Sequence, residues 1–292
     1  MPVSVNNEPK KPKGNPDDKD IQWHPAFFEA IRLELEDYES DLEFVAERQL
    51  TTKPLQIDVV IVKKTRDMPI KKNIAEIFRR DNIIEYKSPT DYVSIENFYR
   101  VYAYACLYAF LEEGADITDM TLTFVASSHP RELLAHLREA RGCTVEEKWP
   151  GVYIVSGDPL PIQIIDNRKL SDGENLWLKG LDNTLDAQGW LRVTSEILRQ
   201  GKPSRMGAYF EAIMRANMES FREAYEMNDN TLALDRMFEE IGLTARWEAK
   251  GEARGETKIL GLFRQGYTVE EVEKMLAQNK VGSTEIPLNG PR

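Results

Sequence analysis

The sequence predicts an α/β protein followed by a mainly helical C-terminal region. Two observations lead to this fold class. Up to about residue 170, short segments rich in β-branched residues alternate with segments of helical spacing, as in LQIDVVIV (55–62) and MTLTFVAS (120–127). From about residue 173 onward, helical spacing continues with few strand signals. We therefore expect a mixed sheet with helices, and then a helical region at 171–247.

The first part of the chain predicts a tail, a helix and two neighbouring strands. Residues 1–22 carry prolines and mixed charges with little to bury, which is typical of a disordered tail. A helix is predicted from Pro25 to Glu39, because Phe27, Phe28, Ile31 and Leu35 recur at helical spacing. Strands follow at 55–62 and 82–87, the second ended by Pro89, and the segment between them predicts a long hairpin connection. One further strand fits near 45–53.

The middle of the chain predicts a second helix and the remaining strands. Ser94 is a suitable N-cap for a helix from Ile95 to Glu113. This helix is apolar nearly all round, so we expect it to be buried, with Cys106 as a small buried side chain and its tyrosines in core packing. A strand at 120–127, a helix at 131–141 and short strands at 152–155 and 161–165 follow.

The predicted helical region contains segments at 173–200, 205–228 and 232–243. Residues 248–292 predict a charged linker and a short terminal helix, in which GYTVEEVEKML fits a capped amphipathic helix. The domain organisation expected is therefore a tail (1–22), an α/β domain (23–170), a helical region (171–247) and this terminal segment. The helical region is also where a homodimer contact is expected.

The composition favours a reducing, cytoplasmic setting for the chain. Its 292 residues include two cysteines and no CxxC or His/Cys cluster, so neither a disulfide framework nor a zinc site is expected. The first twenty residues contain no signal-peptide core. The longest apolar run, 101–111, is shorter than the roughly 20 residues of a membrane-spanning helix, so no membrane partner is expected.

The net charge of −11 argues against a protein that coats nucleic acid, but the charge is unevenly distributed. Residues 29–48 hold eight acidic and two basic side chains, whereas residues 63–80 hold seven basic and two acidic ones. Two solvated faces of opposite sign would explain this. Alternatively, the basic stretch contacts a polyanion, and the candidate DNA-binding residues are then Lys63, Lys64, Lys71, Lys72, Arg79 and Arg80.

Three charged residues lie within apolar strand segments. Asp58 is flanked by Ile57 and Val59, while Glu85 and Lys87 leave the same face of the next strand. An ionised carboxylate in such a setting is costly unless it is paired or binds a metal. If the two strands are neighbours, the three side chains can converge. Two carboxylates and a lysine suit Mg²⁺-assisted phosphodiester hydrolysis.

Asp58 followed by Glu85-x-Lys87, in an α-β-β-β-α-β order, resembles the PD-(D/E)xK nuclease superfamily. More narrowly, LQIDVVIVKK with NIIEYKSPTDYVSIENFYRVYAYACLY resembles its recombination-promoting nuclease and transposase-like branch. The resemblance covers about Trp23 to Ser128. It implies a restriction-endonuclease-like core and a metal-dependent DNA endonuclease with a role in recombination or mobile elements.

The resemblance also implies the roles of individual residues. Asp58 and Glu85 would hold Mg²⁺, or Mn²⁺ in its place, with the Tyr86 carbonyl as a third ligand, and Lys87 would be the catalytic lysine. A first-helix glutamate often joins such sites, and Glu34 is chosen here over Glu29 and Glu36. Ile57 departs from the family pattern, which has proline at that place.

Two alternatives stand beside the nuclease hypothesis. The first is a nuclease-like domain without activity that serves as a binding or regulatory module, which the net charge and the acidic first helix favour. The second is an unrelated α/β protein in which Glu85 and Lys87 form an ordinary same-face ion pair. His129, in the SSHP segment after a strand, could assist a reaction, but a loop histidine beside proline is more often structural.

Overall fold

The computed structural model describes residues 21–46, 59–201, 206–227 and 239, and those from 21 to 227 belong to one compact unit. The first six helices and strands follow the predicted order of helix, three strands, helix and strand. They are α1 (Trp23–Glu34), β1 (Leu42–Ala46), β2 (Val59–Lys64), β3 (Asp81–Lys87), α2 (Ile95–Leu111) and β4 (Met120–Ala126).

The remaining elements complete the sheet and then form the helical region. They are α3 (Arg131–Glu139), β5 (Thr144–Trp149), β6 (Val152–Ser156), β7 (Ile162–Asp166), α4 (Leu176–Gly180), α5 (Ala187–Gln200), α6 (Gly207–Ala216) and α7 (Met218–Glu226). Short 3₁₀ turns lie between some of them, among them η3 (Asn73–Ala75) and η5 (Asn167–Lys169). Three predicted segments lie wholly or mostly outside the described residues. They are the tail at 1–22, the helical segment at 232–243, of which only Glu239 is described, and the linker with the terminal helix at 248–292.

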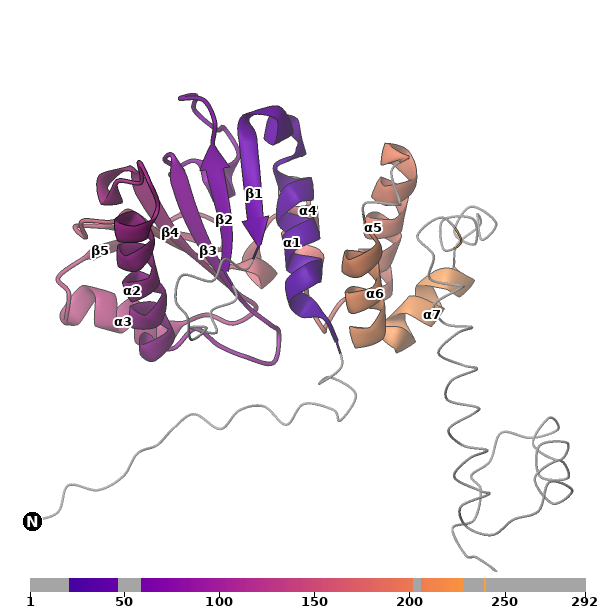
Figure 1. The fold of residues 1–292 in the computed structure, drawn as a ribbon. Helices are drawn as coiled ribbons and strands as arrows, with labels where there is room; N and C mark the ends of the chain where they lie inside the picture. Colours follow the sequence, from indigo (N-terminus) through magenta and orange to yellow (C-terminus); the bar gives the residue numbers. More distant parts are fainter. Residues whose placement is uncertain (1–20, 47–58, 202–205, 228–238, 240–292) are drawn as a thin grey trace, which may run out of the picture. The chain divides into compact units, whose positions relative to one another are not determined.

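The seven strands form one mixed sheet in the order β1-β2-β3-β4-β7-β6-β5 (Figure 1). The pairs β1–β2 and β2–β3 are antiparallel, whereas β3, β4 and β7 run parallel to one another, and β6 and β5 continue the sheet in antiparallel fashion. The prediction of a mixed sheet is thus confirmed. The carboxyl ends of three parallel strands meet at one edge of this sheet.

One face of the sheet is covered by α2 and α3. Ile61, Ile83, Leu122 and Ile162 point to this face and share a single hydrophobic core with both helices. α2 begins at Ser94, whose side chain accepts a hydrogen bond from the Asn97 N–H, so the predicted cap is confirmed.

The prediction that α2 is buried all round is wrong. Its sheet-facing side is buried, but Phe110 is 83% exposed, Tyr99 and Leu111 are exposed as well, and Cys106 is exposed rather than buried. The helix covers the sheet with one side and meets solvent with the other, although the exposed side is also largely apolar. Within the described residues, no helix is long and apolar enough to cross a membrane.

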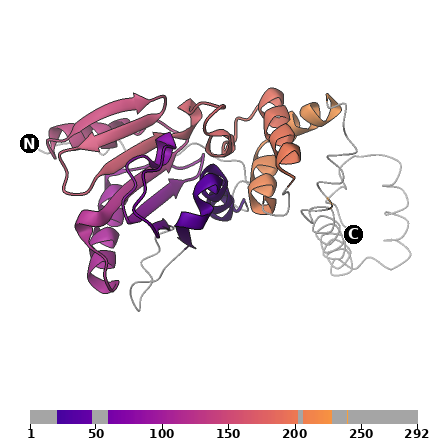
Figure 2. The same ribbon diagram turned by 90° about the horizontal axis from the view of Figure 1, so that it is seen from above.

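The opposite face of the sheet is covered by α1. The Phe27 ring of α1 stacks on the Tyr86 ring of β3 at 4.6 Å between centroids. α1 also packs against α4 and α6, so the described part of the helical region belongs to the same compact unit as the sheet. In the view of Figure 2, α1 lies between the sheet and the helices α5 to α7.

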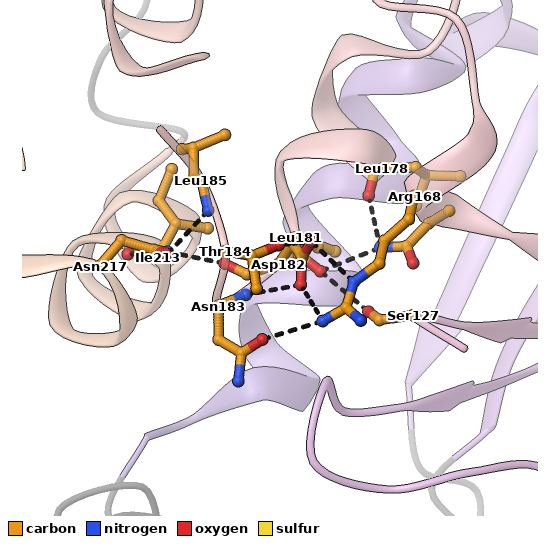
Figure 3. Close-up of polar contacts among 11 residues, drawn as sticks. Ser127, Arg168, Leu178, Leu181, Asp182, Asn183, Thr184, Leu185, Ile213 and Asn217 are labelled. Atoms are coloured by element: carbon orange, nitrogen blue, oxygen red, sulfur yellow. Dashed lines mark hydrogen bonds and ion pairs between the residues drawn. The ribbon is translucent and has the colours of Figure 1, made fainter. Parts of the chain in front are cut away.

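A polar network joins the end of β7 to these helices (Figure 3). Arg168 donates two hydrogen bonds to the Asp182 carboxylate, at 2.8 and 2.7 Å. The Asn217 side chain donates to the backbone carbonyls of Asp182 and Ile213, and it accepts from the Leu185 N–H. These contacts fix the segment after α4 against both the sheet and the last two helices.

Candidate active site

Glu85 and Lys87 form an ion pair at the carboxyl end of β3. The Lys87 Nζ lies 2.7 Å from the Glu85 Oε1, and the two side chains are only 15% and 5% exposed. Alternation along the strand sends both side chains to the face covered by α2 and α3, and it sends Tyr86 to the other face. The structure therefore brings two of the predicted site residues together in a nearly buried position.

Asp58 lies outside the described residues. Val59, the residue that follows it, begins β2 and is the partner of Glu85 in the antiparallel pairing of β2 with β3. The prediction that the two motif strands are neighbours is therefore confirmed. The convergence of Asp58 with Glu85 and Lys87 stays a prediction.

Tyr86 has a structural side chain. Its phenol is fully buried between β3 and α1, where it stacks on Phe27 and meets His24 edge-on at 6.2 Å. Burial raises the pKa of the Tyr86 phenol well above its ordinary value, so the hydroxyl stays protonated. Only the backbone carbonyl of Tyr86 is left as a candidate metal ligand.

The oxygen atoms of Glu85 and of the Tyr86 carbonyl are hard donors, which suit Mg²⁺ or Mn²⁺ rather than zinc. Among the described residues, no group of three or more His, Cys, Asp and Glu side chains converges on one point. A metal that bound here would therefore need the Asp58 carboxylate in addition to Glu85. The donor chemistry fits the predicted ion on that condition.

Glu34 does not meet Glu85 and Lys87. Its Oε1 accepts hydrogen bonds from the backbone N–H groups of Trp177 and Leu178, at 2.8 and 3.0 Å, in the first turn of α4. Its Oε2 lies 2.7 Å from the Lys72 Nζ. Burial raises the pKa of this carboxyl, and the Lys72 ammonium opposes that rise. These contacts describe a helix cap on the opposite face of the sheet.

Glu29 has a similar place in the fold. Its Oε2 accepts a hydrogen bond of 2.7 Å from the Tyr209 N–H, in the first turn of α6. The acidic first helix thus caps two helices of the C-terminal region. Carboxylates at these N-termini complement the helix dipole.

Most of the predicted DNA-binding residues contact acceptors within the protein. Lys63 pairs with Glu112 at 3.0 Å, and Arg80 pairs with Asp81 at 2.9 Å. The others with such partners are Lys64, close to Asp67; Lys72, with Glu34 and the Glu174 carbonyl; and Arg79, with the Thr118 carbonyl. Lys71 is exposed.

The basic stretch also lies away from Lys87 along the sheet. In the β2–β3 ladder, Lys63 lies opposite Asp81 at the start of β3. Lys87 ends the same strand six residues later. Six strand residues span roughly 20 Å. A ligand that contacted both Lys63 and the Glu85–Lys87 pair would have to extend along the length of the strands.

The structure adds Asp166 to the carboxyl edge, a residue that the sequence did not single out. In the parallel ladders, Lys87 pairs with Ala126 of β4, and Ala126 pairs with Asp166 of β7. His129, in the loop after β4, places its Nδ1 3.8 Å from the Asp166 Oδ2. The sequence contained one usable signal, a carboxylate at the end of a strand, but its meaning depended on knowing that β7 is parallel to β3 and β4.

A cavity of about 270 Å³ lies elsewhere, beside α4 and α5. Most of its charged lining is paired within the protein, since Arg168 pairs with Asp182, and both Lys179 and Arg192 pair with Asp172. Neither Glu85 nor Lys87 lines this cavity.

Comparisons of the chain with protein-family models, with curated proteins and with solved structures found no match.

Proposed function

We propose that the protein is a metal-dependent DNA endonuclease whose elements α1 to β4 form a restriction-endonuclease-like core. The observation that carries the proposal is the nearly buried Glu85–Lys87 pair at the end of β3, beside the strand that Asp58 precedes. The order of the six elements and the mixed sheet are compatible with that core. A role in recombination or mobile elements, and a cytoplasmic setting for the unpaired cysteines, belong to the same proposal.

In this proposal Asp58, Glu85 and the Tyr86 carbonyl hold Mg²⁺ or Mn²⁺. The ion would polarise the phosphoryl oxygen and acidify a bound water. Lys87 offsets the negative charge that grows on the phosphoryl oxygens in the transition state. Because the Lys87 ammonium contacts the Glu85 carboxylate directly, β3 fixes both groups relative to each other.

A second candidate function is a nuclease-like binding module without activity. The observation that favours it is the internal pairing of the basic stretch, which leaves fewer cations to contact phosphates. In that case Glu85 and Lys87 would be a structural ion pair, and DNA would not be cleaved.

Plasmid cleavage in the presence of Mg²⁺ tests the two candidates. The wild type should nick or linearise supercoiled DNA, and chelation should stop the reaction. Glu85→Gln and Asp58→Asn should abolish cleavage, and Lys87→Met should lower it by about 10² or more, as for one electrostatic or acid–base group. Glu196→Gln is a suitable control because Glu196 pairs with Arg199 on α5, in the helical region rather than at this edge.

The outcomes separate the candidates. A wild type that does not cleave DNA under any metal contradicts the endonuclease and favours the binding module. Cleavage that survives in both Glu85→Gln and Lys87→Met contradicts the assignment of the site, even if the protein is a nuclease.

A further inference from the structure

The loop after β4 and the end of β7 bring four polar side chains together. They are His129, Asp166, Lys169 and Tyr153. The Lys169 Nζ donates to the Tyr153 hydroxyl at 2.9 Å and lies 3.8 Å from the Asp166 Oδ2. The same carboxylate oxygen lies 3.8 Å from the His129 Nδ1, and the His129 and Tyr153 rings are 5.2 Å apart. The buried Asp166 carboxylate is therefore the centre of the cluster.

The two nitrogens of His129 have different surroundings. Nδ1 is buried, has no hydrogen-bond partner among the described residues, and faces Asp166. The side chain as a whole is 32% exposed, so Nε2 is the nitrogen that can meet solvent or a substrate. A carboxylate behind Nδ1 favours one tautomer and one orientation of an imidazole whose Nε2 takes or gives a proton. Such contacts are often long before a substrate binds.

This cluster shares an edge and a face of the sheet with Glu85 and Lys87. Lys87, Ala126 and Asp166 are successive partners across three parallel strands, and partners in a parallel ladder point to the same face. Two strand spacings separate Lys87 from Asp166, or roughly 10 Å between Cα atoms. The residue between them is Ala126, which is buried in the core beneath α2 and α3. Ligands of open α/β sheets bind at this carboxyl edge.

The charges around His129 keep its ring neutral near pH 7. Burial, Lys169 and Arg131 lower the pKa of His129, while Asp166 and Glu147 oppose this, and the pKa lies below its ordinary value of 6.5. Tyr153 is the other titratable side chain packed on the ring. A neutral imidazole can accept a proton, so the electrostatics agree with the geometry on the role of a base.

We propose that His129, oriented by Asp166, is the general base of the phosphodiester hydrolysis at the Glu85–Lys87 edge. The inference rests on the proposed function, since it concerns the same scissile phosphate. It gives His129 the role of a catalytic residue and Asp166 that of a positioning residue. Lys87, on one side of Ala126, then neutralises charge on the phosphate. His129, on the other side, accepts the proton of the attacking water.

The step balances with water as the only co-reactant. The oxygen of a water molecule forms a bond to phosphorus as the bond from phosphorus to the leaving sugar oxygen breaks. The proton of that water passes to the His129 Nε2. The leaving oxygen takes a proton from solvent, and the imidazolium later returns its proton to solvent. The products are a phosphomonoester end and a free hydroxyl.

The first arm of the test is an NMR titration of the histidine ring carbons, which does not depend on activity. The chain has three histidines, so His129→Gln and His136→Gln assign the signals. Asp166→Asn should lower the pKa of His129, because the carboxylate favours the charged ring. Lys169→Gln should raise it, because an ammonium that disfavours the charged ring is lost. Lys169 lies at the surface, so this variant tests the dyad even if Asp166→Asn folds poorly. A His129 pKa that neither variant moves overturns the dyad.

The second arm is cleavage of plasmid DNA between pH 5 and 9, beside DNA binding by each variant. The wild-type rate should rise with pH through the pKa of His129 and then level off. His129→Gln should bind DNA normally but lose cleavage by about 10²–10⁴ and lose the acidic inflection. The inflection should move down in Asp166→Asn and up in Lys169→Gln. The control is His136→Gln, which should cleave DNA like the wild type. His136 belongs to α3, and its side chain contacts the exposed Tyr99 of α2.

Each outcome decides one point. If the wild type cleaves and His129→Gln cleaves within a few-fold of it, the inference is wrong while the proposed function survives. If the wild type does not cleave at all, the proposed function fails and the catalytic role of His129 fails with it. Opposite NMR shifts in the two neighbouring variants would in that case still establish the His129–Asp166 dyad.

Discussion

The carboxylate of Glu34 offers the sharpest stability prediction. Replacement by alanine removes the acceptor of two backbone N–H groups in the first turn of α4, those of Trp177 and Leu178. A buried donor left without a partner costs about 1–3 kcal/mol, so the two together should cost about 2–6 kcal/mol in free energy of unfolding. Loss of the buried methylene contacts adds to this cost.

Replacement by glutamine should behave differently. The amide oxygen of Gln can still accept both hydrogen bonds, and the Lys72 ammonium keeps the Glu174 carbonyl and some solvent. Burial raises the pKa of Glu34 in the folded protein above the 4.5 of an unperturbed glutamate. The folded state thus keeps this proton to higher pH than the unfolded state, and ionisation lowers wild-type stability as pH rises from about 4.5 through the folded pKa. Glu34→Gln lacks this loss, so at pH 7 it should lie within about 1 kcal/mol of the wild type.

Urea unfolding of the wild type and both variants between pH 4 and 8 measures these effects. Glu39→Ala is the matched control, because it breaks an exposed ion pair with Arg32 worth about 0–1 kcal/mol. A Glu34→Gln variant as unstable as Glu34→Ala at pH 7 would contradict this expectation, since the charge rather than the cap would then stabilise the fold. Cleavage by Glu34→Gln, assayed in parallel, decides whether the predicted role of Glu34 in the site holds.

Three further predictions follow from other parts of the molecule. Arg168→Ala should lower the free energy of unfolding by about 1–2 kcal/mol, because it breaks a two-bond ion pair with Asp182 in which the arginine is partly exposed. Arg192→Ala, a change at an exposed arginine, should alter it by less than about 0.5 kcal/mol. Equal melting temperatures for the two variants would contradict this. Gly151→Ala should cost about 2–4 kcal/mol, since φ is +76° and a Cβ would lie 2.5 Å from the Asp166 carbonyl oxygen; a variant as stable as the wild type in urea would show that this turn relaxes. If the basic stretch contacts phosphates, changing Lys71, Lys72, Arg79 and Arg80 to glutamine should weaken DNA binding and flatten its salt dependence. An unchanged salt slope would show that the stretch is a solvated face that contacts no phosphate.

The sequence predicted best those elements whose local pattern agrees with their burial. The strands β2, β3 and β4 have buried apolar centres, and they were expected at 55–62, 82–87 and 120–127, where the structure has Val59–Lys64, Asp81–Lys87 and Met120–Ala126. The strand β5 was missed because TVEEKW is largely exposed at the edge of the sheet and lacks a buried run. The exposed side of α2 was missed because, apart from Glu96 and Arg100, it is apolar like the buried side.

Parts of the candidate site depended on contacts that no local pattern encodes. Glu34 lies 143 residues before its partner Trp177, and Glu29 lies 180 residues before Tyr209, so their roles as helix caps follow only from the tertiary fold. The spacing of Glu85 and Lys87 does predict a shared face, because alternation is a local property of a strand. Asp166 joins their edge through two parallel ladders, which requires the strand order.

Thermal melting with and without Mg²⁺ probes the proposed metal site itself, because it does not depend on a suitable DNA substrate. An ion that binds only the folded state adds about 2.7 kcal/mol at a hundredfold excess over its Kd, which for a chain of this size shifts the melting temperature by several degrees. We expect this shift for the wild type and for Lys87→Met, and no shift for Glu85→Gln or Asp58→Asn. A wild type whose melting temperature is the same in Mg²⁺, Mn²⁺ and chelator, or a Glu85→Gln variant that keeps the full shift, would contradict a metal site at the end of β3.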